Sequence, residues 1–263
     1  MTEEKPYTTG EFCWNECGTR DPAAVKAFYA EIFGWGMKDV AMPGPEGGTY
    51  TLLQVEGKDV GGLYEMKGPQ FEKVPPHWLS YIHAEDVDAT VKTSESLGGR
   101  TMAEPFDVPG VGRMAMVMDP TGAMFSIFHP GEHGGAARMG DKHGGFCWNE
   151  LMTTDTDKAG AYYTRLFPWT SDTMAGSSGP YTVFKKGDTM AAGMMQITRE
   201  MGPVPPHWLA YVTVTDCDAT VAKATSLGGK ALMPGMDIPD LGRFAVLQDP
   251  SGAVFAVFQS KQG

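Results

Sequence analysis

Residues 12–16 read Phe-Cys-Trp-Asn-Glu, and the same five residues return at 146–150 with an offset of 134. The stretch Pro-Pro-His-Trp-Leu at residues 75–79 returns at 205–209 with an offset of 130. Self-similarity at a nearly fixed period is the signature of a repeated architecture. The sequence is therefore a tandem duplication, and the change of offset indicates a net loss of four residues in the loops of the second copy.

A Gly-rich stretch separates the two copies. Residues 131–145 contain six glycines, a composition typical of a flexible surface linker. We expect a first domain at residues 1–130, this linker at 131–145, and a second domain at 146–263. The histidines in and beside the linker, His129, His133 and His143, are expected to be solvated.

Each half contains a fainter internal repeat of one strand, one helix and further strands. After a strand at residues 12–17, Asp21-Pro22 is typical of a helix N-cap followed by proline. The apolar positions that follow predict one buried helix face, which ends at Gly34. These positions are Val25, Phe28, Tyr29, Ile32 and Phe33. The pattern restarts with a strand at 77–83 and a helix capped by Asp86. Further strands are predicted at 50–55, 60–65, 100–104, 113–118 and 123–128. The chain is therefore predicted to be an α+β protein of four βαβββ modules.

Composition excludes several functional classes. The chain has 21 Lys and Arg against 32 Asp and Glu, a net charge of −11, which argues against a nucleic-acid partner. No apolar run approaches the roughly 18 residues needed to span a bilayer. Residues 1–10 are polar and charged, so no secretory signal is expected. The four cysteines do not form a disulfide framework in a chain of this length. We expect reduced thiols in a cytoplasmic monomer or homodimer without membrane contact.

The four modules resemble the vicinal oxygen chelate superfamily, which includes glyoxalase I, bleomycin-resistance proteins, fosfomycin-resistance enzymes and extradiol dioxygenases. The matching marks are Phe28-Tyr29, Gly98-Gly99 and the turns Asp-Pro-x-Gly at 119–122 and 249–252. The repeated Trp-Asn-Glu is similar to a duplicated actinobacterial subgroup labelled glyoxalase-like or "hydroxylase". This resemblance implies two cup-shaped open β-barrels with flanking helices. It implies less about the reaction, because this fold carries several chemistries.

Superfamily members hold a divalent metal with side chains near the start of a module's first strand and on its closing strand. Counting from the matching motifs places hydrophobic or weakly ligating residues at these positions. They are Trp14, Leu79 and Ser126 in the first half and Trp148, Leu209 and Ala256 in the second. Such groups do not replace imidazole and carboxylate as metal ligands. We therefore expect no metal at the usual positions.

Polar side chains remain beside these positions. Because strand side chains alternate, Glu16 faces the same side as Trp14, and His77 the same side as Leu79. Glu150 and His207 repeat this arrangement. A carboxylate and an imidazole in one pocket are able to transfer protons, so we take Glu16, His77, Glu150 and His207 as candidate catalytic residues. Two alternatives stay open, a structural role and a displaced metal site.

A second group of residues is placed in substrate binding. Trp14 and Trp148 could stack on an aromatic ligand or pack in the core. Tyr81 and Tyr211 lie on the same strand faces as His77 and His207. Arg113 and Arg243 could bind an acidic group or form structural ion pairs. Met116 and Ser126 lie on strands expected to form the first cup.

Three functions are compatible with this pattern. The first is a glyoxalase-like enzyme, with isomerase, lyase, cyclase or hydroxylase-like chemistry, that transfers protons on a hydrophobic, oxygen-bearing small molecule. The second is a binding protein that sequesters a small molecule or an antibiotic, as bleomycin-resistance proteins do. The third is a metal-dependent lyase or dioxygenase with rearranged ligands. The Glu and His side chains favour the enzyme that transfers protons. The absence of a carboxylate at the closing-strand positions, Ser126 and Ala256, argues against the metal-dependent enzyme.

Overall fold

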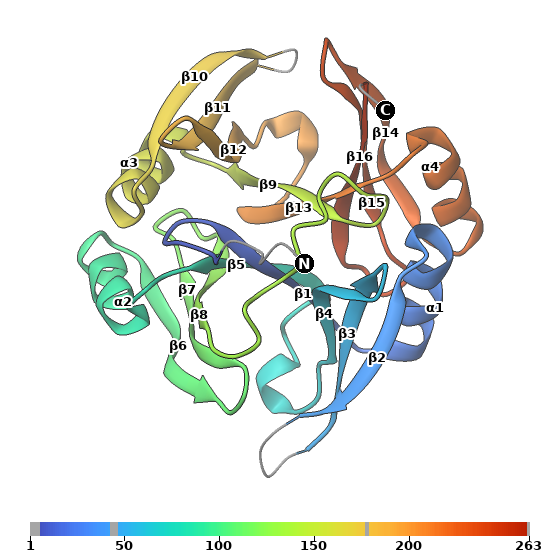
Figure 1. Ribbon diagram of the computed structural model, residues 1–263. Coiled ribbons are helices and arrows are strands. Elements are labelled where there is room, and N and C mark those ends of the chain that lie inside the picture. The colour runs from blue at the N-terminus through green and yellow to red at the C-terminus, as the bar shows by residue number, and fades with distance from the viewer. Residues whose placement is uncertain (1–5, 43–46, 177–178, 262–263) are drawn as a thin grey trace. The chain divides into compact units, whose positions relative to one another are not determined.

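Residues 6–42, 47–176 and 179–261 are described by the computed structural model shown in Figure 1. Residues 1–5, which belong to the polar stretch considered above as a signal, lie outside this range. The described residues form sixteen strands and four α-helices in the order βαβββ repeated four times. No α-helix among them is long and apolar enough to span a bilayer.

The first half of the chain contains two modules. The first comprises β1 (Phe12–Thr19), α1 (Pro22–Phe33), β2 (Gly36–Ala41), β3 (Thr49–Val55) and β4 (Lys58–Glu65). The second comprises β5 (His77–His83), α2 (Val87–Ser96), β6 (Arg100–Val108), β7 (Gly112–Met118) and β8 (Met124–Pro130).

The second half repeats this order. The third module comprises β9 (Phe146–Thr153), α3 (Thr156–Leu166), β10 (Thr170–Gly176), β11 (Gly179–Lys186) and β12 (Thr189–Gln196). The fourth comprises β13 (His207–Thr213), α4 (Cys217–Ser226), β14 (Lys230–Ile238), β15 (Gly242–Gln248) and β16 (Val254–Ser260).

The strands form two eight-stranded sheets, each built from the two modules of one half. Their orders are β2-β3-β4-β1-β5-β8-β7-β6 and β10-β11-β12-β9-β13-β16-β15-β14. The predicted fold class of four βαβββ modules is confirmed, and the two sheets are consistent with two cup-shaped open barrels. The strand order also places β1, which carries Glu16, beside β5, which carries His77, in one sheet.

The helix boundaries follow the local signals in the sequence. The carboxylate of Asp21 accepts a hydrogen bond from the Ala24 amide at 3.1 Å, and Pro22 occupies the first turn. Gly34 ends α1 in the left-handed region with a φ of 67°. Asp86, Asp155 and Asp216 cap the other three helices in the same way. The predicted buried face of α1 is confirmed.

One strand of the first module was not predicted. β2, with the sequence Gly-Met-Lys-Asp-Val-Ala, lies at the edge of its sheet and buries none of its side chains completely. The strand was not predicted because its apolar and polar residues do not alternate as they do in a half-buried strand. The predicted strand at 100–104 is also longer, because β6 continues to Val108.

By packing, the chain forms two compact units that do not coincide with its halves. Unit I consists of residues 1–14, 79–135 and 149–209, and unit II of residues 15–78, 136–148 and 210–263. Each unit thus combines a module of the first half with one of the second. In unit II α1 packs beside α4, and in unit I α2 packs beside α3 (Figure 1).

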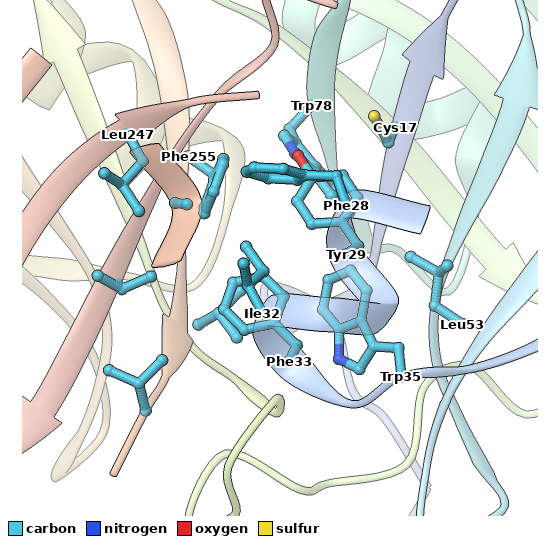
Figure 2. Packing of buried hydrophobic residues seen from close by; sticks show 14 of the residues in the cluster. Cys17, Phe28, Tyr29, Ile32, Phe33, Trp35, Leu53, Trp78, Leu247 and Phe255 are labelled. Carbon is cyan, nitrogen blue, oxygen red and sulfur yellow. The ribbon is translucent and has the colours of Figure 1, made fainter. Parts of the chain in front are cut away.

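The core of unit II is rich in aromatic rings. Tyr29 and Phe33 of the first module pack against Phe255 of the fourth, and Trp35 packs against Tyr29 and Phe33 (Figure 2). The ring centroids of Tyr29 and Phe255 are 5.4 Å apart, and those of Phe33 and Trp35 are 4.7 Å apart. These spacings lie in the range of favourable aromatic pairs. The two modules therefore share one hydrophobic core.

A buried hydrogen-bond chain links the same modules. The Tyr29 hydroxyl donates to Asp249 at 3.1 Å and accepts from the Trp78 indole at 2.9 Å. The other oxygen of Asp249 accepts backbone amides of residues 251–253 and so fixes the Asp-Pro-x-Gly turn. Burial raises the pKa of Tyr29 well above its usual value, which keeps the phenol protonated as a donor.

Unit I repeats this chain with the second copy of each residue. The Tyr163 hydroxyl donates to Asp119 at 3.0 Å and accepts from the Trp208 indole at 2.9 Å. Asp119 again fixes its turn through backbone amides. The helix tyrosine and the Asp-Pro-x-Gly turn, which marked the family resemblance, are therefore partners in the folded protein.

Part of the Gly-rich segment is packed, which differs from the flexible surface linker expected from its composition. The Ala137 amide donates to the Asp59 carbonyl at 2.7 Å, and the Trp35 indole donates to the Gly144 carbonyl at 2.8 Å. Met139 is buried in the core of unit II. All four cysteines are free, and burial raises the pKa of Cys147 to about 11.

We predict that Tyr163→Phe lowers the free energy of unfolding by about 1–3 kcal/mol, because it leaves a buried carboxylate oxygen and a buried indole donor without their partner. Tyr29→Phe should act similarly in unit II. Urea denaturation followed by circular dichroism measures both effects. Ser226→Ala removes an exposed, local hydroxyl bond and serves as the control, expected to change stability by less than about 0.5 kcal/mol. Equal stability of Tyr163→Phe and the wild type would contradict the assigned role.

Candidate functional site in the first sheet

Glu16 and His77 lie on the same side of the first sheet. Their neighbours Cys17 and Trp78 both belong to the core of unit II. Because side chains alternate along a strand, Glu16 and His77 point away from that core. They stand on adjacent strands, β1 and β5.

Glu16 is bonded to a residue that the sequence analysis did not select. The Tyr50 hydroxyl on β3 donates to the Glu16 carboxylate at 2.7 Å. Gly62 of β4 is paired in register with Glu16, and a Cβ atom at this position would collide with the Tyr50 hydroxyl. The absence of a side chain at Gly62 is therefore what allows Tyr50 to cross β4 and reach the carboxylate.

A second phenol lies on the same face. Tyr64 of β4 is paired in register with Tyr50 on β3 and with Gly18 on β1, two residues beyond Glu16. Burial, followed by the charges of Glu16 and Cys17, raises the pKa of Tyr64, so this hydroxyl remains protonated. Glu16 thus has one phenol bonded to it and another nearby. The glycine pair at 61–62 was the available sequence signal for this arrangement.

The imidazole of His77 is held by its own chain. Its Nδ1 lies 2.9 Å from the Pro75 carbonyl, and His207 makes the same contact with Pro205 at 2.8 Å. Since a carbonyl only accepts, Nδ1 carries the proton, and a neutral ring then has its lone pair on Nε2. Burial lowers the pKa of both histidines, which favours this neutral form. This contact with the backbone agrees with the structural role that was considered for His77. It also leaves Nε2 able to accept a proton.

The second sheet repeats the arrangement with differences. Leu151 and Trp208 face the core of unit I, so their neighbours Glu150 and His207 face the other side. Glu150 is paired with Gly193, the counterpart of Gly62, but it is only 6% exposed, whereas Glu16 is half-buried. Met195 replaces Tyr64. The first sheet is therefore the better candidate for chemistry in contact with solvent.

The usual metal positions of the superfamily do not fit a metal in this chain. Leu79, Leu209 and Ala256 are buried and offer no ligand atom. The Ser126 hydroxyl donates to the Ala115 carbonyl at 3.1 Å. Trp14 is buried with its ring 4.8 Å from that of His133, and Trp148 is half-buried. We therefore assign no catalytic step to a metal at these positions.

The remaining predicted residues are placed as follows. Tyr81 and Tyr211 are buried, with rings 5.7 Å from Phe128 and 6.2 Å from Phe244. Met116 is half-buried and is paired in register with Ser126.

Arg113 and Arg243 form ion pairs with neighbouring elements. Arg113 contacts Asp88 on α2 at 2.6 Å and Asp107 at 3.1 Å. Arg243 contacts Asp218 on α4 at 3.0 Å and Asp237 at 2.9 Å. These contacts correspond to the structural alternative stated for both residues.

Comparison with known families agrees with the fold. Residues 16–127 match the glyoxalase/bleomycin resistance protein/dioxygenase superfamily, and residues 147–258 match the glyoxalase-like domain. The matched segments lie one in each half of the duplication.

Two relatives align over nearly the full chain. One is "Putative glyoxylase CFP32" from Mycobacterium tuberculosis, 39% identical over 260 residues that cover 98% of each protein. The other is the anthracycline biosynthesis protein DnrV from Streptomyces peucetius, 36% identical over 272 residues that cover 98% of this chain and 96% of the relative.

Solved structures share the fold at low sequence identity. The Mn(II)-bound glyoxalase from Novosphingobium aromaticivorans has a TM-score of 0.63 at 17% identity, over 95% of this chain and 82% of its own. Homoprotocatechuate 2,3-dioxygenase from Arthrobacter globiformis has a TM-score of 0.62 at 15% identity, over 98% of this chain and 82% of its own. Because one family match lies in each half and the relatives align with 98% of the chain at 36–39% identity, the chain belongs to the glyoxalase/bleomycin resistance protein/dioxygenase superfamily.

Proposed function

We propose that this protein is a glyoxalase-like enzyme that transfers a proton on a hydrophobic, oxygen-bearing small molecule, with Glu16 as the base. The observation that carries this proposal is the hydrogen bond from Tyr50 to Glu16 at 2.7 Å, made possible by Gly62. This bond orients a half-buried carboxylate on the face opposite the core. A base held in a fixed position is what general base catalysis requires.

The residues of this face suggest one reaction type. Glu16 removes a proton from a carbon next to a carbonyl group, and the electron pair of that bond moves toward the carbonyl oxygen. Tyr64, which stays protonated, is placed to donate a hydrogen bond to the developing negative charge. Return of the proton from Glu16 to another carbon of the same system completes an isomerisation. Nε2 of His77 offers a second acceptor on the neighbouring strand.

The substrate class is inferred from the relatives and from the apolar surroundings. DnrV and DauV, each 36% identical to this chain, are both named as anthracycline biosynthesis proteins. The face of Glu16 carries the rings of Tyr50 and Tyr64. We infer an aromatic, polyketide-like carbonyl compound as the preferred substrate.

A second candidate function is binding without turnover. It is favoured by the residues at the usual metal positions, since Leu79 and Leu209 are apolar and offer no ligand atom for a catalytic metal. The Tyr50–Glu16 bond favours the enzyme, since a sequestering pocket does not need an oriented carboxylate.

Glu16→Gln should lower the rate of proton exchange at least about 100-fold while preserving ligand affinity, because the amide keeps the shape but is not a base. The measurement is proton loss in D2O, followed by NMR, on hydroxyanthraquinones that carry a ketone side chain. Glu150→Gln is the matched variant of the second sheet, and exposed Glu104→Gln is the control. Exchange at the full rate in Glu16→Gln would remove Glu16 as the base. Binding of these compounds without exchange by the wild type would support the binding function instead.

Gly62→Ala should reduce exchange about tenfold, because the added methyl group displaces Tyr50 from Glu16. Adding Tyr50→Ala to Gly62→Ala removes the colliding hydroxyl and ring, so the clash should be relieved while the activity stays low. Gly160→Ala on α3 meets only an ordinary contact, with Met194 at 3.6 Å, and serves as the control. Full activity of Gly62→Ala would show that the Tyr50 contact does not support the base. Unfolding curves in urea monitor the stability of each variant.

The neutral histidines predict a pH dependence of stability. The pKa values of His77 and His207 are lowered in the folded protein by burial, so the unfolded chain binds protons more readily. The free energy of unfolding should therefore fall as the pH decreases below about 6.5, the usual histidine pKa. His77→Gln and His207→Gln should each flatten this decline, and the double variant should flatten it most. Urea denaturation between about pH 5 and 8 tests this, and an unchanged slope in the double variant would contradict it.

A further inference from the structure

Three metal-ligating side chains meet in unit I at the carboxyl ends of β5 and β8. They are His83, Glu85 and His129, and one ligand atom of each lies within 4.8 Å of the other two. We propose that this cluster is a binding site for a divalent transition-metal ion of the zinc type. Two imidazoles and one carboxylate are a ligand set that zinc uses in enzymes, with a further position left for water or substrate.

The strands bring the two histidines together. β5 and β8 are parallel, and His83 at the end of β5 is paired in register with Phe128, the residue before His129. The two imidazole centroids are 5.4 Å apart. Glu85 follows His83 by two residues, where the chain has left the strand. The fold therefore holds both imidazoles on a rigid sheet, and the carboxylate lies on the mobile end of an exposed side chain.

His83 provides an independent indication of a ligand. Its side chain is only 3% exposed, and its Nδ1 is buried with no hydrogen-bond partner among the described residues. A buried polar atom without a partner costs free energy, so such atoms are rare in folded proteins. A metal ion bound to the ring would supply a partner that the protein does not.

His129 shows the orientation expected of a ligand. Its Nδ1 lies 3.2 Å from the Ala84 carbonyl, so Nδ1 carries the proton and the Nε2 lone pair is available. Histidines that bind metals commonly donate their other ring nitrogen to a backbone carbonyl, which fixes the tautomer. The sequence analysis expected His129 to be solvated, but the structure shows it half-buried and bonded.

The charges around the cluster are compatible with a bound cation. Glu11 lies close by, since the His83 amide donates to its carbonyl at 2.8 Å, and its carboxylate is 3.8 Å from the Lys186 ammonium. Burial, then the neighbouring His129, lowers the pKa of His83, and Lys186 acts in the same direction, whereas Glu85 and Glu11 oppose it. A neutral imidazole is the form that binds metals.

The site is open on one side. Glu85 is exposed, and His129 lines an open groove of about 360 Å³ together with Arg113, Gly131 and Glu132. Ligand atoms around a tetrahedral zinc ion lie roughly 3.4 Å apart, because each is about 2.1 Å from the metal. The three ligand atoms, which lie within 4.8 Å of one another, must therefore move closer together when zinc binds.

The cluster differs from the usual sites of the superfamily. His83 lies four residues beyond Leu79 and His129 three residues beyond Ser126, the two positions that normally provide ligands. It is also confined to the first half, since Thr213 and Gln259 replace the histidines in the second. Those residues have structural roles, with Thr213 donating to the Gly140 carbonyl and Gln259 accepting the Cys217 amide. Duplication alone therefore does not explain the cluster.

Isothermal titration of the chelator-treated full chain with Zn2+ tests the proposal, and Co2+ reports the ligand geometry through its visible absorption. We expect one equivalent of Zn2+ to bind at pH 7.5 and the affinity to fall at least tenfold in His129→Gln and in Glu85→Gln. The affinity should also fall below pH 6.5, because protons compete for the imidazoles. His143→Gln removes a half-buried histidine outside the cluster and is the control.

Wild-type affinity in both His129→Gln and Glu85→Gln would overturn the proposal, as would the absence of stoichiometric binding. These two residues are preferred to the buried His83, whose replacement could unfold the chain. His83→Gln is used only where circular dichroism shows native structure, and it should then lose binding as well. The titration does not depend on turnover. Absence of zinc binding would therefore not argue against the Glu16 reaction, and absence of that reaction would not argue against the metal site.

Discussion

A buried hydrogen bond between a helix tyrosine and a turn aspartate ties the two halves of this chain together. Tyr29 of the first module bonds Asp249 of the fourth, and Tyr163 of the third bonds Asp119 of the second. Each aspartate also fixes the backbone of its own turn, so one carboxylate determines both a local conformation and a contact with a residue 220 positions away for Asp249 and 44 positions away for Asp119. The aromatic core around each tyrosine and the strands that carry Glu16 and Glu150 depend on this contact.

The sequence predicted the features that have local or periodic causes. The caps at Asp21 and Asp86, the buried face of α1 and the strand at 77–83 follow from capping chemistry and from apolar spacing, and the structure confirms them. The edge strand β2 was missed because its exposed residues carry no period. Composition suggested a flexible linker, whereas Met139 and Gly144 are fixed by contacts with residues distant in sequence.

The candidate site also combines features with local causes and features that depend on contacts between distant residues. Alternation predicted that Glu16 shares a strand face with Trp14 and His77 with Leu79, because this depends only on the strand period. Tyr50 could not be found in this way, since its role requires the register of β3, β4 and β1 and the missing side chain of Gly62. The cluster of His83 and His129 likewise depends on two parallel strands ending side by side. Chemistry that spans strands is set by pairing, which a single sequence does not display.

The composition of the two compact units constrains how the protein is made. Unit II begins at residue 15, and its core includes Phe255 and Val257, close to the last residue of the chain. During synthesis the aromatic face of α1 leaves the ribosome long before the strand that covers it. Contacts between such distant segments form slowly, and apolar surface waiting for its partner is prone to aggregation. Unit II is therefore completed only after residues 210–261 have been synthesised, and the helix of the first module must remain unprotected, or be shielded by a chaperone, until then.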